Sequence, residues 1–149
     1  MRWARTVGMT GSAVAVAAMV TACEKPPPSI TVWSGTHSVS AEALCWSFEE
    51  TSLGEGQCAE DILQGSRTEG LPSLPAQPGN TLGISVDPVV AEAGWQIRAQ
   101  GQPVVPETLE TKYYRVTTST PGQPVTLQVV AGREAQVQGV WLVALDVQQ

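Results

Sequence analysis

TLGISVDPVVAEAGWQIRA, from Thr81 to Ala99, is the stretch of this sequence that decides the fold. Apolar residues alternate with polar or small ones in both halves of the stretch, as they do in half-buried β-strands. Between the halves, Asp87 is a candidate N-cap, Pro88 suits the first helical position and Gly94 suits the helix exit. The stretch therefore predicts two strands joined by a single helical turn, which we expect to cross from one sheet to another.

The same period of two covers most of the chain from Ile30 onward, with Trp95 and Trp141 on the inward face of their strands. Turn signals separate the segments at Gln100-Gly101, Pro121-Gly122 and Gly132. The predicted strands are 30–33, 38–46, 81–86, 95–99, a short one near 104, 112–117, 125–130 and 140–147. This pattern predicts an all-β fold, an immunoglobulin-like β-sandwich of about seven to eight short strands with one helical turn.

Residues 64–80 break the pattern. Pro72, Pro75 and Pro78 recur there among glycines, so we expect no regular structure. A loop of this length in a compact domain is usually either functional or disordered. Leu71 and Leu74 supply two apolar anchors, which favour packing along the surface of a sheet.

The N-terminus is typical of a bacterial lipoprotein signal. Arg2 and Arg5 precede an apolar run, and the run ends in Val20-Thr21-Ala22-Cys23. The run is shorter than the roughly 18 to 20 residues that span a bilayer, which disfavours a retained anchor, while simple secretion leaves the cysteine at the cleavage point unexplained. We predict a signal peptide at 1–22 and acylation of Cys23, with palmitate or similar chains holding the protein to the extracytoplasmic face of the cell membrane.

The remaining chain suits one domain. Residues 23–29 contain three consecutive prolines and are predicted to form an extended tether that lifts a domain at 30–149 slightly off the membrane. The full sequence has a formal net charge of −6, and loss of the signal arginines makes the mature chain more acidic. Such a surface disfavours nucleic acid as a partner.

Cys45 and Cys58 are the other two cysteines. An even pair outside the cytoplasm predicts a structural disulfide. A redox site would need Cys-x-x-Cys, and zinc would need more ligands than two thiols and the single His37.

Catalysis and cofactors are not expected. His37 is the one available histidine base, and although Ser34 and Ser38 lie near it, a histidine among serines in a turn is usually solvated. The segment 42–61 contains six carboxylates and no lysine or arginine, which a solvated acidic loop explains and which leaves calcium as an alternative. We predict no catalytic residue, no metal site and no cofactor.

Binding is the remaining class of function. The alternation places Trp33 and Trp46 opposite the inward residues, with further large side chains nearby. The candidate binding surface comprises Trp33, Trp46, Phe48, Leu71, Leu74 and Tyr114. Rigid aromatic side chains suit an envelope protein or a glycan as partner. The alternative is that Trp33 and Trp46 pack beneath residues 71–78.

Four short motifs and the N-terminal signal resemble those of a family of actinobacterial lipoproteins that carry a domain of unknown function. The motifs are Gly83-Ile84-Ser85-Val86-Asp87-Pro88, Gly94-Trp95, Lys112-Tyr113-Tyr114 and Gly139-Val140-Trp141. The resemblance implies a β-rich domain in the cell envelope, and only Cys23 carries over as a functional residue.

Together these features predict a membrane-anchored, non-enzymatic binding or accessory module of the envelope. The alternative is an inhibitor of secreted proteases, because small immunoglobulin-like inhibitors use a loop that residues 87–95 resemble weakly.

Overall fold

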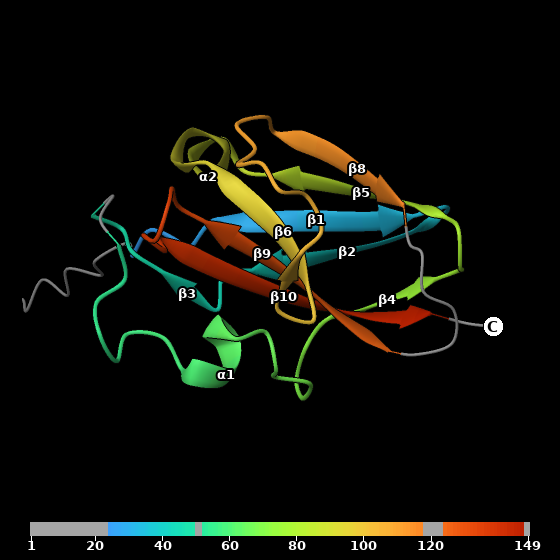
Figure 1. The fold of residues 1–149 in the computed structure, drawn as a ribbon, viewed down its shortest axis with the longest axis horizontal. Helices are drawn as coiled ribbons and strands as arrows, with labels where there is room; N and C mark the ends of the chain where they lie inside the picture. The colour runs from blue at the N-terminus through green and yellow to red at the C-terminus, as the bar shows by residue number, and fades with distance from the viewer. Residues whose placement is uncertain (1–23, 50–51, 118–123, 148–149) are drawn as a thin grey trace, which may run out of the picture.

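The computed structural model describes residues 24–49, 52–117 and 124–147, which form an all-β sandwich of two packed sheets (Figure 1). The predicted signal at 1–22, Cys23 and the turn at 121–122 lie outside the described residues.

Sheet A has four antiparallel strands in the order β2 (His37–Glu42), β1 (Ser29–Ser34), β5 (Thr81–Val86) and β8 (Tyr113–Thr117). The alternation in the sequence determines which face is buried. Ile30, Val32 and Ile84 are at most 1% exposed and point into the sandwich, while their neighbours along the strands point out.

Sheet B has the order β3 (Cys45–Trp46), β10 (Gly139–Val147), β9 (Val125–Ala131), β6 (Trp95–Ala99) and β7 (Gln102–Pro103). β4 (Ser73–Ala76) pairs in parallel with the other end of β10, and the remaining pairs are antiparallel. Trp95 and Trp141 are fully buried between the sheets, which confirms their assignment to the core.

The helical crossover is also confirmed. α2 (Pro88–Ala93) follows Asp87, precedes Gly94 and carries the chain from β5 in sheet A to β6 in sheet B. Asp87 does not cap the helix through its side chain. Its carboxylate instead accepts a hydrogen bond of 2.7 Å from the backbone N–H of Ser29, which joins the start of β1 to the end of β5.

The single strand predicted at 38–46 is wrong, because the chain changes sheets within it. β2 ends at Glu42 in sheet A, and β3 begins at Cys45 in sheet B. At the crossing, the Ala43 N–H bonds the Pro28 carbonyl and the Leu44 N–H bonds the Val140 carbonyl. The alternation of side chains continues through the change of partner strand, so the sequence pattern does not reveal it.

The prediction that 64–80 lacks regular structure is wrong as well. β4 lies within this segment at the edge of sheet B, where proline is tolerated because one side of an edge strand needs no donors. Leu74 and Ala76 are 1% and 3% exposed, so the segment contributes to the core. A second short helix, α1 (Glu60–Leu63), precedes it and was not predicted.

Candidate functional site

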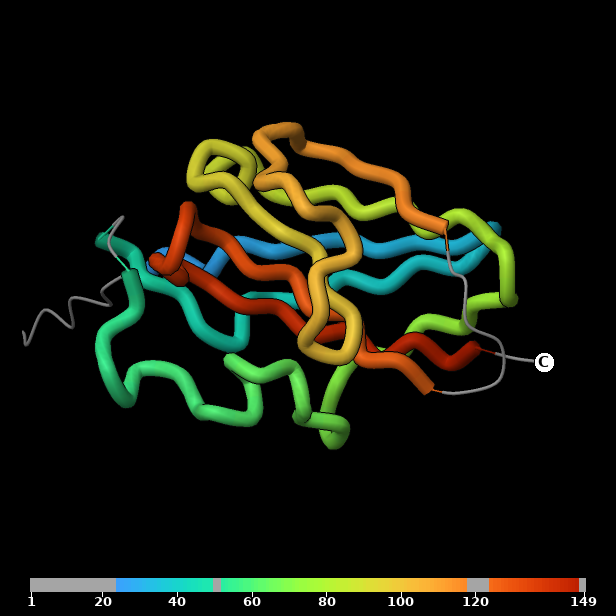
Figure 2. Tube along the Cα trace, viewed as in Figure 1, coloured from blue at the N-terminus to red at the C-terminus, as the bar shows by residue number. Residues whose placement is uncertain are grey.

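The outer face of sheet B is covered. The segment from Leu53 to Leu71, which includes α1, packs on the outward side chains of β3 and β10 and forms a small second core. Its buried members are Cys45, Cys58, Ile62, Val140 and Leu142. Figure 2 shows this segment in green along the side of the molecule away from β5 and β8.

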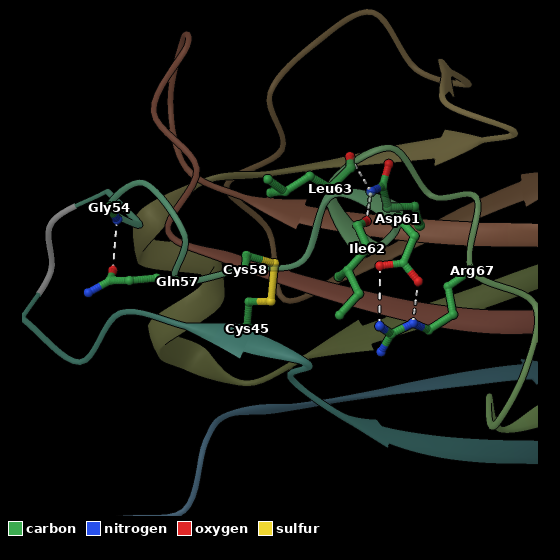
Figure 3. Close-up of a disulfide and its surroundings, with 9 residues drawn as sticks. Cys45, Gly54, Gln57, Cys58, Asp61, Ile62, Leu63 and Arg67 are labelled. Carbon is green, nitrogen blue, oxygen red and sulfur yellow. Dashed lines mark hydrogen bonds and ion pairs between the residues drawn. A yellow bond between two sulfur atoms is a disulfide. The ribbon is translucent and has the colours of Figure 1, made fainter.

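The Cys45–Cys58 disulfide fastens this cover, as the sequence predicted (Figure 3). The two Cα atoms are 5.6 Å apart. Beyond it, the buried Gln128 amide of β9 donates to the carbonyls of Ile62 and Leu63 at 2.8 and 2.9 Å. The cover is therefore joined to sheet B both covalently and by hydrogen bonds to the last residues of α1.

A bidentate ion pair lies on the outside of the cover (Figure 3). Arg67 donates from Nε and Nη2 to the two carboxylate oxygens of Asp61, at 2.6 and 3.2 Å. The hydrogen bond from Arg67 holds the pKa of Asp61 below its ordinary value of 3.8.

The outer face of sheet A is open by contrast. On its two outermost strands, the outward side chains are exposed, including Ser38 and Ser40 on β2 and Tyr113 and Arg115 on β8. Thr31, Trp33 and Ser85 on the two central strands are half-buried, so the outer strands are the most accessible part of this face.

Three side chains form a stack on this face, which we call the aromatic stack: Trp33, Tyr113 and Arg115. The Trp33 and Tyr113 rings are parallel within 4°, with their centroids 5.0 Å apart. The Arg115 guanidinium carbon lies 5.4 Å from the centroid of the Tyr113 ring, and its Nε donates to the Tyr113 hydroxyl. The arrangement combines offset stacking with a cation–π contact.

Gly83 explains how Trp33 sits on the sheet. A Cβ atom at Gly83 would overlap Cε2, Cζ2 and Nε1 of the Trp33 indole, so the ring lies directly on the backbone of β5. Glycine in the middle of a strand leaves this space for an aromatic side chain from the neighbouring strand.

Hydroxyl groups surround the aromatic stack. The strand registers place Ser40, Thr31, Ser85 and Tyr113 in one row across the sheet, with Ser38, Trp33, Gly83 and Arg115 in the next row. Thr31 and Ser40 are hydrogen-bonded through their hydroxyls at 3.1 Å. Among the described residues Arg115 makes no ion pair, whereas Arg67 and Arg133 do. In the part of the chain that the structure describes, the face therefore offers hydroxyls, an aromatic surface and a guanidinium without a carboxylate partner.

The six residues predicted as one binding surface lie in several separate places, and two of them, Trp46 and Phe48, line one groove. Trp33 is half-buried on the outer face of sheet A, whereas Trp46 belongs to sheet B and packs on Gly139 and Trp141. Leu71 is part of the second core, and Leu74 and Tyr114 belong to the main one. Phe48 is 51% exposed at the end of the sandwich where the described chain begins.

The prediction that Trp33 and Trp46 share one binding surface is therefore wrong. The alternative, that both pack beneath residues 71–78, is wrong for Trp33, which lies on Gly83 and Tyr113. Tyr113 and Arg115 were missed as surface residues. The alternation along β8 is the sequence signal that could have identified them. Tyr113 shares its face with Arg115 and Thr117, whereas Tyr114 shares its face with Val116.

His37 is exposed at the first residue of β2. Within the described part of the chain, no three His, Cys, Asp or Glu side chains are grouped to hold a metal ion, and Glu50 of the acidic segment lies outside that part. In the same residues, no helix has the length and apolar character needed to cross a bilayer.

No protein-family model, curated protein or solved structure matches this chain. The geometry of the two sheets therefore carries the functional interpretation.

Proposed function

We propose that this chain is a lipid-anchored, extracytoplasmic binding protein of the cell envelope, and that it binds glycans through the outer face of sheet A. The observation that carries the proposal is the difference between the two outer faces. One is closed by a disulfide-fastened cover, and the other is open and bears the aromatic stack.

The chemistry of the open face matches that of a sugar. The C–H groups on one side of a pyranose ring are attracted to aromatic side chains, and Trp33 and Tyr113 place two such side chains on the open face. Hydroxyls of Ser38, Ser40 and Ser85 lie in reach along the same face and can both donate to and accept from sugar hydroxyls. Arg115 adds a donor suited to a carboxylate, which favours an acidic sugar.

The anchor is proposed from the N-terminal sequence. Arg2, Arg5 and the segment ending in Cys23 supply each part of a lipoprotein signal, and the Cys45–Cys58 disulfide suits an oxidising compartment. We also propose that the sandwich belongs to the immunoglobulin-like class, since two mainly antiparallel sheets enclose a tryptophan-containing core.

The protease-inhibitor alternative has less support. Residues 88–93 form α2, and a helix does not present the extended backbone that a protease cleft accepts. Gly94 and Trp95 at its exit lead directly into a core strand.

Binding to soluble oligosaccharides tests the proposal. The probes are N-acetylhexosamine oligomers with and without carboxylate groups, presented to the mature protein. We expect Tyr113→Ala and Arg115→Gln each to weaken binding by about tenfold, which corresponds to about 1.4 kcal/mol. Val104→Ala is the matched control, because Val104 is 43% exposed but lies outside sheet A. Equal binding by all four proteins, or no binding to any oligomer, would overturn the proposal.

A further inference from the structure

The chain is fixed to the sandwich from Pro28 onward, whereas Glu24, Lys25 and Pro26 are exposed. The carbonyl of Pro28 accepts a hydrogen bond of 2.9 Å from the buried indole N–H of Trp141 and another of 3.1 Å from the backbone of Ala43. The next residue, Ser29, is fixed by Asp87. The predicted tether is therefore attached to one end of the sandwich through its last two residues, Pro28 and Ser29.

An apolar groove of about 610 Å³ lies beside this attachment. Pro26, Pro27, Trp46, Phe48 and Val89 supply its apolar wall, from the tether, from β3 and the residues after it, and from α2. Phe48 is the outermost large side chain in it, with 51% of its surface exposed. In Figure 1 the starts of β1 and α2 and the end of β3 lie at the same end of the molecule.

The distance between this groove and Cys23 is short. Five peptide steps separate Cys23 from Pro28, and a fully extended chain covers about 3.3 to 3.6 Å per residue, or about 17 Å in all. Acyl chains on Cys23 would thus hold the groove within about 17 Å of the bilayer surface.

We propose that the end of the sandwich formed by Pro26, Trp46, Phe48 and Val89 rests on the lipid bilayer, with the Phe48 ring inserted at the interface between headgroups and acyl chains. The inference rests on the proposed anchor at Cys23 and adds the orientation of the domain. Apolar side chains beside a lipid anchor gain free energy by entering this interface.

The charges at this end indicate which lipids it accepts. Among the residues described, the charged side chains that line the groove are Glu24, Lys25 and Asp87, and Glu49 next to Phe48 is exposed, so carboxylates outnumber cations there. Attraction to anionic headgroups is therefore not the driving force. The contact is apolar and should form equally well on zwitterionic lipid.

This orientation of the domain on the bilayer leaves the aromatic stack accessible. β1 starts at the docked end and runs toward the opposite end of the molecule, so the strands of sheet A lead away from the bilayer (Figure 1). The outer face of sheet A then stands to the side, where an envelope polymer can reach it.

The test uses the full mature lipoprotein in vesicles of phosphatidylcholine whose acyl chains are brominated and quench tryptophan fluorescence on contact. Phe48→Trp places a reporter in the groove. Thr36→Trp is the matched control, because Thr36 is exposed in the turn between β1 and β2 at the opposite end. Thermal unfolding of both variants verifies folding.

We expect bromolipid to quench about half of the emission added by Phe48→Trp and little of that added by Thr36→Trp. A second variant, Phe48→Ser, should reduce the quenching of the native Trp46. Equal quenching at positions 48 and 36, in a protein whose mass shows acyl chains, would overturn the proposed contact of Phe48 with the bilayer. It would not affect the proposed lipid anchor at Cys23. A mass without acyl chains would overturn the proposed anchor, and with it the proposed contact of Phe48.

Discussion

The missing Cβ of Gly83 determines how the aromatic stack rests on sheet A. Trp33 occupies the space that a side chain at this position would fill, and Tyr113 then stacks on Trp33. Glycine ordinarily weakens a strand, and an aromatic neighbour that covers its backbone restores packing. The glycine and the tryptophan are therefore one structural unit.

Gly83→Ala tests that unit. The added methyl group would overlap the indole and force it off the sheet, so we expect the free energy of unfolding to fall by about 1 to 3 kcal/mol in denaturant titrations. Ser85→Ala, on the same strand and face, should change it little. Adding Trp33→Leu to Gly83→Ala should recover part of the loss. A Gly83→Ala protein as stable as the parent would contradict the account of the stack.

The ion pair of Asp61 and Arg67 predicts an acid-dependent contribution to stability. The hydrogen bond from Arg67 lowers the pKa of Asp61 below 3.8 in the folded protein, while the unfolded chain keeps the ordinary value. The contribution is thus present above pH 3.8 and is lost as the pH falls through the lowered pKa.

In urea titrations, the difference in unfolding free energy between the parent and Asp61→Asn should be constant above about pH 5 and should shrink below it. Arg67→Gln should give the same profile, because it removes the other partner. A difference that does not change with pH would show that the pair contributes nothing in solution.

Sequence reasoning at this scale succeeded for some buried residues, but it failed for Leu74, which was predicted on the binding surface and is 1% exposed, and for the faces of β8. Trp95, Trp141 and the disulfide pair followed from alternation and from cysteine arithmetic. Tyr114 was predicted to lie on the binding surface, but it packs against the core and Tyr113 is exposed, in line with the exposed Arg115 and the half-buried Val116. Two adjacent tyrosines do not by themselves show which of the two points outward.

At the scale of elements, the disulfide and the cover of sheet B act together. Cys45 and Cys58 join β3 to the residues before α1, and a closed loop of this size contributes about 3 kcal/mol in the chain-entropy model. Replacing both cysteines by serine should lower the free energy of unfolding by about that amount.

Amide hydrogen exchange of this double variant should accelerate in residues 52–71 and much less in β1 and β5. Sheet A provides the internal control, since it does not contact the cover through the second core. Uniformly faster exchange across both sheets would mean that the disulfide holds the whole sandwich together, contrary to this account.

Elements set by local sequence were predictable, and those set by distant partners were not. α2 follows from Asp87-Pro88 and Gly94 within eight residues. The change of sheet between Glu42 and Cys45 and the strand β4 both depend on β10, which lies far along the chain. Periodicity identifies a strand but does not reveal its partner, so one predicted strand was in fact two and one predicted loop contained a strand.

At the scale of the molecule, each part of the surface has a different proposed task. The cover closes the outer face of sheet B, the open face of sheet A bears the aromatic stack, and the end at Pro28 and Phe48 is proposed to meet the membrane. Residues predicted from sequence as one patch are distributed over all three regions and the core. A pattern of exposed aromatics does not show how they are grouped in space.

This arrangement requires that the mature chain begin at an acylated Cys23. The signal peptidase of the lipoprotein pathway acts only after the thiol is modified, so Cys23→Ala should leave an uncleaved precursor or a protein released into the medium. The same substitution should leave the Cys45–Cys58 disulfide intact, because that pair is independent of the anchor.

The intact mass of the protein extracted from the membrane fraction tests the central claim most directly. We predict a chain that starts at Cys23, carries diacylglycerol on its thiol and lacks two further hydrogens because Cys45 and Cys58 are bonded to each other. A membrane-bound chain that retains residues 1–22, or a mature chain without acyl groups, would contradict the claim.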